Sequence, residues 1–190
     1  MLKEPLPGRV KTRLGHEMGM VQAAGWFRRT ALSLIRRLRD PRWTIVLAVS
    51  PDRSGQISRV WPADLERTPQ GRGDLGVRMG RMIRAMPPGP VCVIGADVPE
   101  MSRQHIARAF KALGSSDAVF GPATDGGYWL VGMKRTRTVP PGLFKNVRWS
   151  TEFALDDTMA SIPDRSIGLV ATLTDVDTLS DLNRLTGKLA

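Results

Sequence analysis

The sequence contains one cysteine, two histidines and no long apolar run. Cys92 has no second cysteine for an internal disulfide, and its place in the apolar run VCVIG predicts a core position. Two histidines and one cysteine are too few for a zinc site of the usual kind. The longest purely apolar runs, such as IVLAV at 45–49, fall far short of the roughly 20 residues that a membrane span needs. With no signal-peptide pattern either, the sequence predicts a cytoplasmic protein without a membrane partner.

Aromatic residues are also few, and acidic residues are outnumbered by basic ones. Aromatics make up 6% of the chain, and no interleaving of basic and aromatic residues indicates a base-stacking sheet. Lys and Arg number 28 against 18 Asp and Glu, a net charge of +10. This charge suits an anionic partner, either nucleic acid or a phosphorylated small molecule. It equally suits solvated faces, because the arginines of FRRTALSLIRRLR at 27–39 alternate with leucines at helical spacing.

Helical and strand patterns alternate along the 190 residues. Helices are expected at 20–39, 74–86, 103–113, about 151–161 and 180–189, and strands at 43–51, 89–97, 117–122, 127–133 and 166–173. Asp74 and Ser150 or Thr151 are candidate N-caps, and Thr178 with Asp181 resembles a capping box. This order predicts a three-layer α/β/α sandwich with a mainly parallel, mixed sheet. We expect a single domain over 1–190, since no repeat or linker interrupts the pattern.

Four aspartates follow strands of this predicted sheet. Asp97 comes at the end of the strand 89–97, Asp125 lies in a glycine turn after 117–122, and Asp175 and Asp177 follow 166–173. Ligands of open α/β sheets bind at the carboxyl ends of the strands. Carboxylates there suit Mg²⁺ or Mn²⁺ together with substrate phosphates. Each aspartate also has a plainer explanation, because Asp is common in turns for its hydrogen bonds alone.

The opening stretch GRVKTRLG, residues 8–15, has the composition of a phosphate-binding loop. Two glycines surround Arg9, Lys11, Thr12 and Arg13. Catalysis at a phosphate centre is mostly positioning and charge stabilisation, so cations opposite a set of carboxylates are the parts that it needs. The loop and the strand-end aspartates together therefore predict chemistry on a phosphate.

A second glycine motif, GRGDLG at 71–76, offers a competing interpretation. Gly71, Gly73 and Gly76 form a literal G-x-G-x-x-G, and Asp97 lies 21 residues beyond the last glycine. A dinucleotide fingerprint must directly follow a buried strand, whereas the preceding ADLERTPQ is polar and contains a proline. The glycines are better explained by a close approach of the backbone to a ligand, with Asp74 at the helix start. A dinucleotide-dependent oxidoreductase remains an alternative.

Several blocks come in an order that resembles a family of little-characterised bacterial proteins. This family is described as glycosyltransferase-like, has the nucleotide-diphospho-sugar transferase (glycosyltransferase A) fold, and is similar to the phospholactate and molybdenum-cofactor guanylyltransferases. The resemblance spans nearly the whole chain. The blocks are KEPLPGRVKTRLG, GRGDLGVRM, IGADVPEM, GPATDGGYWLVG, LFKNVRWST and DVDTLSDL.

The resemblance implies a metal site and a nucleotide site. Asp97 in GADVP matches the strand-end aspartate that binds the metal in this fold. Asp175 and Asp177 in DVDTLSDL match the late acidic block that completes the site, with Mg²⁺ or Mn²⁺ as the ion. Lys11 and Arg13 match the cations that contact the triphosphate in nucleotidyltransferases. The further candidate nucleotide-binding residues are Gly8, Arg9, Thr12, Gly73, Asp74 and Gly76.

The resemblance also implies an acceptor side. The candidate acceptor-binding residues are Asp125, Gly126, Gly127 and Tyr128, and the candidate catalytic residues are Lys11, Arg13, Asp97 and Asp125. Trp149, Ser150 and Thr151 resemble a family signature, and the plainer explanation for them is a helix cap beside a core tryptophan.

The start of the chain departs from the family pattern. Members typically begin with a hydrophobic strand before K-x-P-x-P-G, and here only Met1 and Leu2 correspond to it. That strand is normally central, so its loss would leave neighbouring backbone groups unpaired. We expect the true start to lie upstream, or another segment or chain to fill the position.

Two reactions fit these expectations. A nucleotidyltransferase would join a nucleoside triphosphate to a phosphorylated small acceptor, and the cations of the opening loop favour it because a triphosphate needs more cationic contacts. A glycosyltransferase would move a sugar from a nucleotide-sugar, as the family description favours. The expected partners are then a nucleotide or nucleotide-sugar and a small acceptor. A homo-oligomer is compatible with these expectations. A non-enzymatic basic RNA-binding protein is a further alternative.

Overall fold

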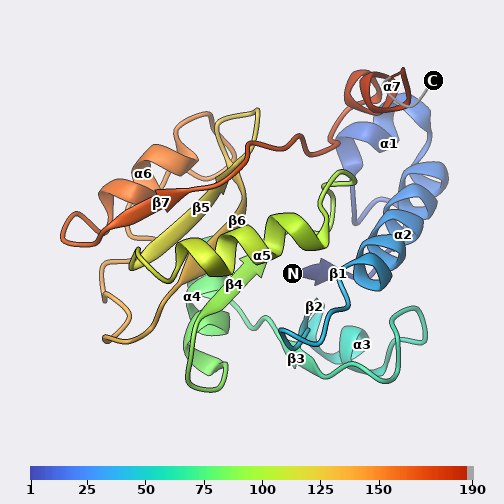
Figure 1. Cartoon of the computed structure of the whole chain (residues 1–190). Helices are drawn as coiled ribbons and strands as arrows, with labels where there is room; N and C mark the ends of the chain where they lie inside the picture. Colours follow the sequence, from blue (N-terminus) through green and yellow to red (C-terminus); the bar gives the residue numbers. More distant parts are fainter. Residues whose placement is uncertain (188–190) are drawn as a thin grey trace. The chain divides into compact units, whose positions relative to one another are not determined.

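The computed structural model describes residues 1–187 (Figure 1). Its helices are α1 Thr12–Met18, α2 Met20–Arg37, α3 Asp52–Ile57, α4 Leu75–Ala85, α5 Arg103–Ala112, α6 Ala154–Ala160 and α7 Leu179–Gly187. Its strands are β1 Leu2–Lys3, β2 Leu47–Ser50, β3 Arg67–Pro69, β4 Val91–Ile94, β5 Ala118–Pro122, β6 Tyr128–Met133 and β7 Ile167–Leu169. The alternation confirms the predicted mixed α/β class. No helix among these residues is both long and apolar enough to cross a bilayer.

The chain groups into two compact units. Unit 1 comprises Met1–Pro69, Ala96–Met101 and the segment from Thr174 onward, and unit 2 comprises Gln70–Gly95 and Ser102–Leu173. The described strands form one sheet in each unit, with parallel pairs in both. The single domain expected from the sequence stays a prediction.

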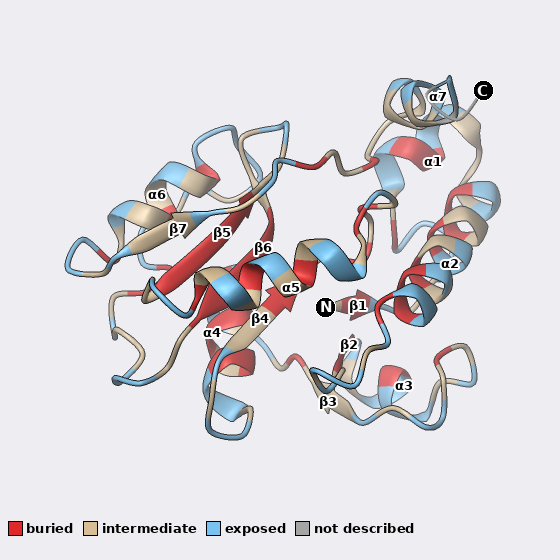
Figure 2. Ribbon diagram, viewed as in Figure 1, coloured by how far each residue is buried: buried red, intermediate tan, exposed pale blue. Residues whose placement is uncertain are grey.

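Unit 1 is built on a three-stranded parallel sheet in the order β1-β2-β3. In α2, the buried residues recur at helical spacing, and four of them pack with Leu47 and Val49 of β2 in one core cluster. The arginines Arg28, Arg29, Arg36 and Arg37 lie between these positions and are exposed, as the solvated-face interpretation predicts. Figure 2 shows this alternation along α2. The arginines of α2 are therefore explained as the solvent-exposed face of an amphipathic helix.

Parts of unit 1 differ from the elements expected from the sequence. The first strand is reduced to Leu2–Lys3, which pairs in parallel with β2. The stretch 54–72, which contains none of the expected helices or strands, holds most of α3 and the short strand β3, which ends at Pro69. Arg67 of β3 organises the preceding loop, because its guanidinium donates to the carbonyls of Ser58 at 2.7 Å and Trp61 at 2.9 Å. These bonds join a side chain to backbone carbonyls nine and six residues earlier, and a hydrophobic pattern does not reveal them.

Unit 2 contains a four-stranded mixed sheet in the order β4-β6-β5-β7. The strand β6 is antiparallel to both β4 and β5, which are the strands on either side of it, and β7 is parallel to β5. The strands expected at 117–122 and 127–133 are confirmed, and they pair as an antiparallel hairpin. In both of its strands nearly every residue is buried (Figure 2). Covering of both faces explains why their sequences read as continuous apolar runs.

Candidate functional site

Three aspartates from two distant segments of unit 1 come together. Carboxylate oxygens of Asp97, Asp175 and Asp177, one from each residue, all lie within 4.8 Å of one another, and all three residues are half-buried. The backbone links the two segments, since Val176 N donates to the carbonyl of Asp97 at 3.2 Å. Val176 is buried between the two late aspartates and packs with Leu14 and Ala23. We call the three carboxylates the acidic cluster.

Neighbouring hydrogen bonds fix the backbone around the acidic cluster. Thr178 N donates to Asp181 Oδ2 at 2.9 Å and Asp181 N donates to Thr178 Oγ1 at 3.2 Å, which confirms the capping box predicted at the start of α7. Asp177 N donates to the same Asp181 oxygen at 3.2 Å. On the other segment, Arg37 Nη2 of α2 donates to the carbonyl of Pro99 at 2.5 Å. Both aspartate-bearing segments are therefore anchored to helices of unit 1.

Lys11 of the opening loop reaches into the acidic cluster. Its Nζ lies 2.6 Å from Asp97 Oδ2 and 2.6 Å from Asp177 Oδ1. The side chain is only 7% exposed. Burial of Lys11 opposes its charged form, but the charges and hydrogen bonds of Asp97 and Asp177 outweigh burial, and the pKa of Lys11 is raised. Lys11 is therefore a buried cation shared by two carboxylates.

The rest of the opening loop is open to solvent. Arg9 N donates to the carbonyl of Leu6 at 3.0 Å across Pro7 and Gly8, and Gly8 has a φ of +72°. Pro followed by a left-handed glycine is the pattern of a type II turn. The side chain of Arg13 is 67% exposed and its Nη1 lies 3.5 Å from Asp177 Oδ2. The structure thus brings Lys11 and Arg13 to the acidic cluster, and leaves Gly8, Arg9, Thr12 and Arg13 exposed.

In unit 2, the predicted acceptor residues form the turn between β5 and β6. Asp125 is exposed and its Oδ1 accepts from Gly127 N at 2.9 Å, the ordinary hydrogen bond of an aspartate in a turn. Gly126 has a φ of +84° and lies against the backbone of Glu152. Tyr128 begins β6, and burial raises the pKa of its hydroxyl, which accepts from Thr158 Oγ1 at 3.3 Å.

The second glycine motif serves the start of α4. Asp74 is the N-cap of α4, and its side chain accepts from Val77 N at 2.8 Å. Gly73 has a φ of +118°, which only glycine adopts readily. Gly76 lies inside α4, where an added Cβ would come within 2.7 Å of the Trp149 ring and 2.6 Å of Phe144 Cβ. The glycines therefore have a structural role in unit 2.

The sequence did not predict which contacts hold the glycine loop before α4, or where Trp149 packs. Arg78 and Arg81 of α4 bind back to Gln70, which is 3% exposed, through Arg78 Nη1 to Gln70 Oε1 at 3.3 Å and Arg81 Nη1 to the Gln70 carbonyl. The Trp149 ring packs against Tyr128 and Phe144, with centroids 6.5 and 6.1 Å apart. Arg78 and Arg81 lie four and seven residues after the N-cap, so they share one face of α4. This spacing was the sequence signal that could have predicted their bonds to the preceding loop.

The expectation that Ser150 or Thr151 caps the next helix is wrong. The helix α6 begins at Ala154 with Phe153 as N-cap, and no side chain caps it. Thr151 Oγ1 instead donates to the Arg148 carbonyl at 2.7 Å, and accepts from Phe153 N at 3.3 Å. Ser150 has a φ of +62°. A turn of this kind uses the same residue types as a helix cap, so the sequence pattern did not separate the two.

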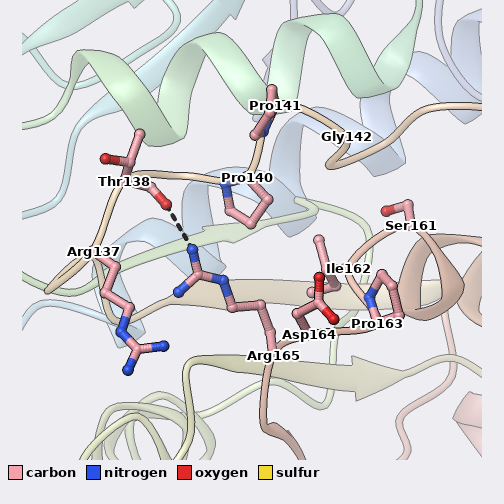
Figure 3. A pocket seen from close by; sticks show the side chains of 10 residues that line it. All are labelled: Arg137, Thr138, Pro140, Pro141, Gly142, Ser161, Ile162, Pro163, Asp164 and Arg165. Atoms are coloured by element: carbon pink, nitrogen blue, oxygen red, sulfur yellow. Dashed lines mark hydrogen bonds between the residues drawn. The ribbon is translucent and has the colours of Figure 1, made fainter.

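A pocket elsewhere in unit 2 contains none of the predicted site residues (Figure 3). Arg165 Nη2 donates to the Thr138 carbonyl at 3.0 Å, whereas the Arg137 side chain points away from the other lining residues. Its polar groups do not converge on one point, so it is a weaker candidate than the acidic cluster. It is lined by Arg137, Thr138, Pro140, Pro141, Gly142, Ser161, Ile162, Pro163, Asp164 and Arg165.

Several solved structures are similar to this chain. One is a provisionally assigned nucleotide-diphospho-sugar transferase from Desulfovibrio desulfuricans G20, with a TM-score of 0.84 and 26% identity over 97% of this chain and 83% of that chain. A second is 4-diphosphocytidyl-2C-methyl-D-erythritol synthase from Anaerococcus prevotii DSM 20548, with a TM-score of 0.54 and 11% identity over 86% and 88% of the two chains. A third is Rv0371c from Mycobacterium tuberculosis H37Rv, with a TM-score of 0.52 and 15% identity over 84% and 82%.

These likenesses confirm the nucleotide-diphospho-sugar transferase fold that the sequence blocks implied. The comparison with curated proteins gives no match. A family model described as "Uncharacterized protein conserved in bacteria (DUF2064)" matches residues 34–151. That range covers more than half of the chain and lies within the expected resemblance. The chain therefore belongs to this family of conserved bacterial proteins, DUF2064.

Proposed function

We propose that this chain is a divalent-metal-dependent nucleotidyltransferase, which joins a nucleoside triphosphate to a phosphorylated small acceptor. The observation that carries the proposal is the acidic cluster, three carboxylates within 4.8 Å, next to the exposed cation of Arg13. Carboxylates beside exposed cations are the parts that phosphoryl transfer uses, because its catalysis is mostly positioning and charge stabilisation. The likeness to transferases of this fold supports the same class.

The donor set of the acidic cluster fits Mg²⁺ or Mn²⁺. All its ligand atoms are carboxylate oxygens, which these ions prefer. Around Mg²⁺, two ligand oxygens are about 4.2 Å apart when opposite and about 3.0 Å apart when adjacent, so oxygens that lie within 4.8 Å of one another would move closer together to share one ion. Asp97, Asp175 and Asp177 would hold the ion. When bound, it would neutralise and orient the phosphate oxygens of the substrate.

The chain's own cations would supply the remaining stabilisation. In the proposed step, a phosphate oxygen of the acceptor forms a bond to the α-phosphorus, while the bond from that phosphorus to the bridging oxygen of pyrophosphate breaks. Arg9 and Arg13 are exposed and would neutralise the charge on the departing pyrophosphate. The attacking phosphate oxygen is already ionised at neutral pH, so no side chain has to remove a proton.

The residues of unit 2 enter the proposal through the resemblance. Asp125 and Tyr128 would contact the acceptor, and the backbone of Gly126 and Gly127 would shape its site. Gly73, Asp74 and Gly76 would border the nucleotide. The exposure of Asp125 supports this role, because its second carboxylate oxygen can serve a ligand while Oδ1 holds the turn.

A glycosyltransferase that takes a nucleotide-sugar is the second candidate. The likeness to the provisionally assigned nucleotide-diphospho-sugar transferase from Desulfovibrio desulfuricans, with its TM-score of 0.84, favours it. The two reactions use the same cation-holding cluster but release different products. Nucleotidyl transfer releases pyrophosphate from a triphosphate, whereas glycosyl transfer releases a nucleoside diphosphate from a nucleotide-sugar.

The test begins with thermal-shift screening of the purified chain against nucleoside triphosphates and nucleotide-sugars, with and without Mg²⁺ or Mn²⁺. We expect a nucleotide to raise the melting temperature only when metal is present. If no nucleotide raises the melting temperature, with or without metal, the proposal is wrong. The binding nucleotide is then incubated with phosphorylated and sugar acceptors, and the release of pyrophosphate or of nucleoside diphosphate identifies the reaction.

A variant pair locates the activity. Asp97→Asn removes one charge from the acidic cluster and keeps the shape, so we expect turnover to be lost with the circular dichroism spectrum unchanged. Asp64→Asn is the matched control, since Asp64 of unit 1 is exposed and forms an ion pair with Arg39 at 2.6 Å, away from the acidic cluster. Turnover like that of the wild type in Asp97→Asn would remove Asp97 from the metal site.

A further inference from the structure

We propose that Lys11 is a displaceable internal counter-ion of the acidic cluster. On this inference a divalent cation and the Lys11 ammonium compete for the same carboxylate oxygens, and metal binding releases the lysine to solvent or to a phosphate group. The inference rests on the proposed metal site and adds a conformational step to it. The added step is a change in the position of the Lys11 side chain.

The first support is geometric. The Lys11 Nζ is within 2.6 Å of oxygens from Asp97 and Asp177, two of the three members of the acidic cluster. Such short charge-assisted contacts place the ammonium between the carboxylates that would hold a metal. A metal ion bonded to these two residues at about 2.1 Å would occupy much of the same space. The two cations cannot both lie there.

The second support is the contrast between Lys11 and Arg13. Both residues belong to the opening loop, but the Lys11 side chain is 7% exposed and the Arg13 side chain is 67% exposed. A lysine that binds phosphate must present its ammonium to the substrate. In the described arrangement Lys11 presents it to carboxylates, so a role on phosphate requires the side chain to leave them.

The third support is the backbone of Lys11. Its φ of +45° and ψ of +49° are left-handed, a conformation that is unfavourable for a residue other than glycine. It lies directly before α1, at the N-cap, and makes no side-chain cap hydrogen bond. The ion pairs with Asp97 and Asp177 are contacts that can offset this strain. Once they are lost, the loop can relax toward an ordinary conformation.

The fourth support is charge. Two carboxylates, those of Asp97 and Asp177, share the single Lys11 ammonium, and the exposed Arg13, at 3.5 Å from Asp177, adds only weak compensation. A divalent ion neutralises the cluster better than a single ammonium. Released near the bound metal, Lys11 would then face the phosphates that the metal attracts.

The experiment measures the accessibility of lysines to an amine-acylating reagent by mass spectrometry. The wild-type chain is treated briefly at pH 8 without divalent ions and with saturating Mn²⁺. Without metal, we expect Lys11 to react at least about tenfold more slowly than the exposed Lys3, because it is buried and ion-paired. With Mn²⁺, Lys11 should react about tenfold faster, and the rate at Lys3 should not change.

A second measurement follows Mn²⁺ binding by electron paramagnetic resonance in the wild type and two variants. Lys11→Met removes the competing cation, so we expect Mn²⁺ to bind about tenfold more tightly. Lys3→Met makes the same chemical change at an exposed position of β1 and should bind Mn²⁺ as the wild type does. The labelling experiment needs no variant, so the test survives if Lys11→Met fails to fold.

The outcomes separate this inference from the function on which it rests. If Mn²⁺ binds but the labelling rate of Lys11 stays low, the lysine is not displaced and the inference is wrong, while the metal site stands. If Mn²⁺ binds neither the wild type nor Lys11→Met, the proposed metal site is wrong and the inference falls with it. If Mn²⁺ raises the labelling rate of Lys11 and leaves that of Lys3 unchanged, both the metal site and the displacement of Lys11 are supported.

Discussion

The substitution Gly126→Ala tests whether the turn that carries Asp125 is held by close backbone packing. A Cβ at this position would lie 2.5 Å from Glu152 Cα, and the other nearest atoms are also Glu152 backbone. The contact cannot relax by moving a flexible side chain. The facing segment is tied back to the turn, since Leu155 N donates to the Gly126 carbonyl at 3.1 Å. Either the turn or the start of α6 must therefore move.

The expected loss of stability has two parts. A left-handed φ, here +84°, costs an alanine about 1–2 kcal/mol. Forcing an extra methyl into a packed site costs about 1–3 kcal/mol. Gly89→Ala in the same unit is the matched control, because Gly89 has a φ of +120° with nothing within 4 Å of an added Cβ. The control carries the backbone cost without the steric cost.

Calorimetric melting of the wild type and both variants decides the matter. For a chain of this size, 1 kcal/mol corresponds to a shift of about 2–4 °C. We expect Gly126→Ala to lower the melting temperature by about 4–20 °C and Gly89→Ala by about 2–8 °C. If the two variants melt within 2 °C of each other, the contact with Glu152 does not hold the turn, and the account of Gly126 is refuted.

Two further predictions follow from shifted pKa values. Burial raises the pKa of the Cys92 thiol to about 12, so the native chain should react with a disulfide reagent at pH 8 at least about a hundredfold more slowly than the urea-unfolded chain; comparable rates would contradict the burial. Hydrogen bonds from Arg148 lower the pKa of Asp157 from 3.8 to about 2. The stability that Asp157 contributes is therefore complete above pH about 4 and is lost as the pH falls toward 2. Chemical denaturation of the wild type and Arg148→Met should show an advantage of the wild type that shrinks across this window, and an advantage that stayed constant would refute the assignment.

The sequence predicted best what depends on local pattern. The apolar stripe of α2, the capping box of Thr178 with Asp181, and the N-cap Asp74 all rest on residues a few positions apart. The meeting of Asp97 with Asp175 and Asp177 was also foreseen, because it follows from where parallel strands end. In each case a short-range rule or a rule of topology was sufficient.

The sequence could not predict contacts between distant side chains. Lys11 lies 86 residues from Asp97 and 166 from Asp177, and its pattern in the loop pointed to phosphate instead. Likewise, no local signal relates Gly76 to Trp149, although the close contact explains why a glycine stands inside α4. Such pairs depend on tertiary packing, and they produce no periodic pattern along the sequence from which they could be predicted.

The position of Lys11 bears directly on which reaction this chain performs. The preference for nucleotidyl transfer rested on the number of cations in the opening loop, since a triphosphate needs more of them than a diphosphate-sugar. With Lys11 bound to Asp97 and Asp177, only Arg9 and Arg13 of that loop present their charge to solvent. A triphosphate therefore gains its third cation only if metal binding releases Lys11. If the lysine remains with its carboxylates, the loop is better matched to the smaller charge of a nucleotide-sugar, so the labelling experiment on Lys11 also discriminates between the two transferases.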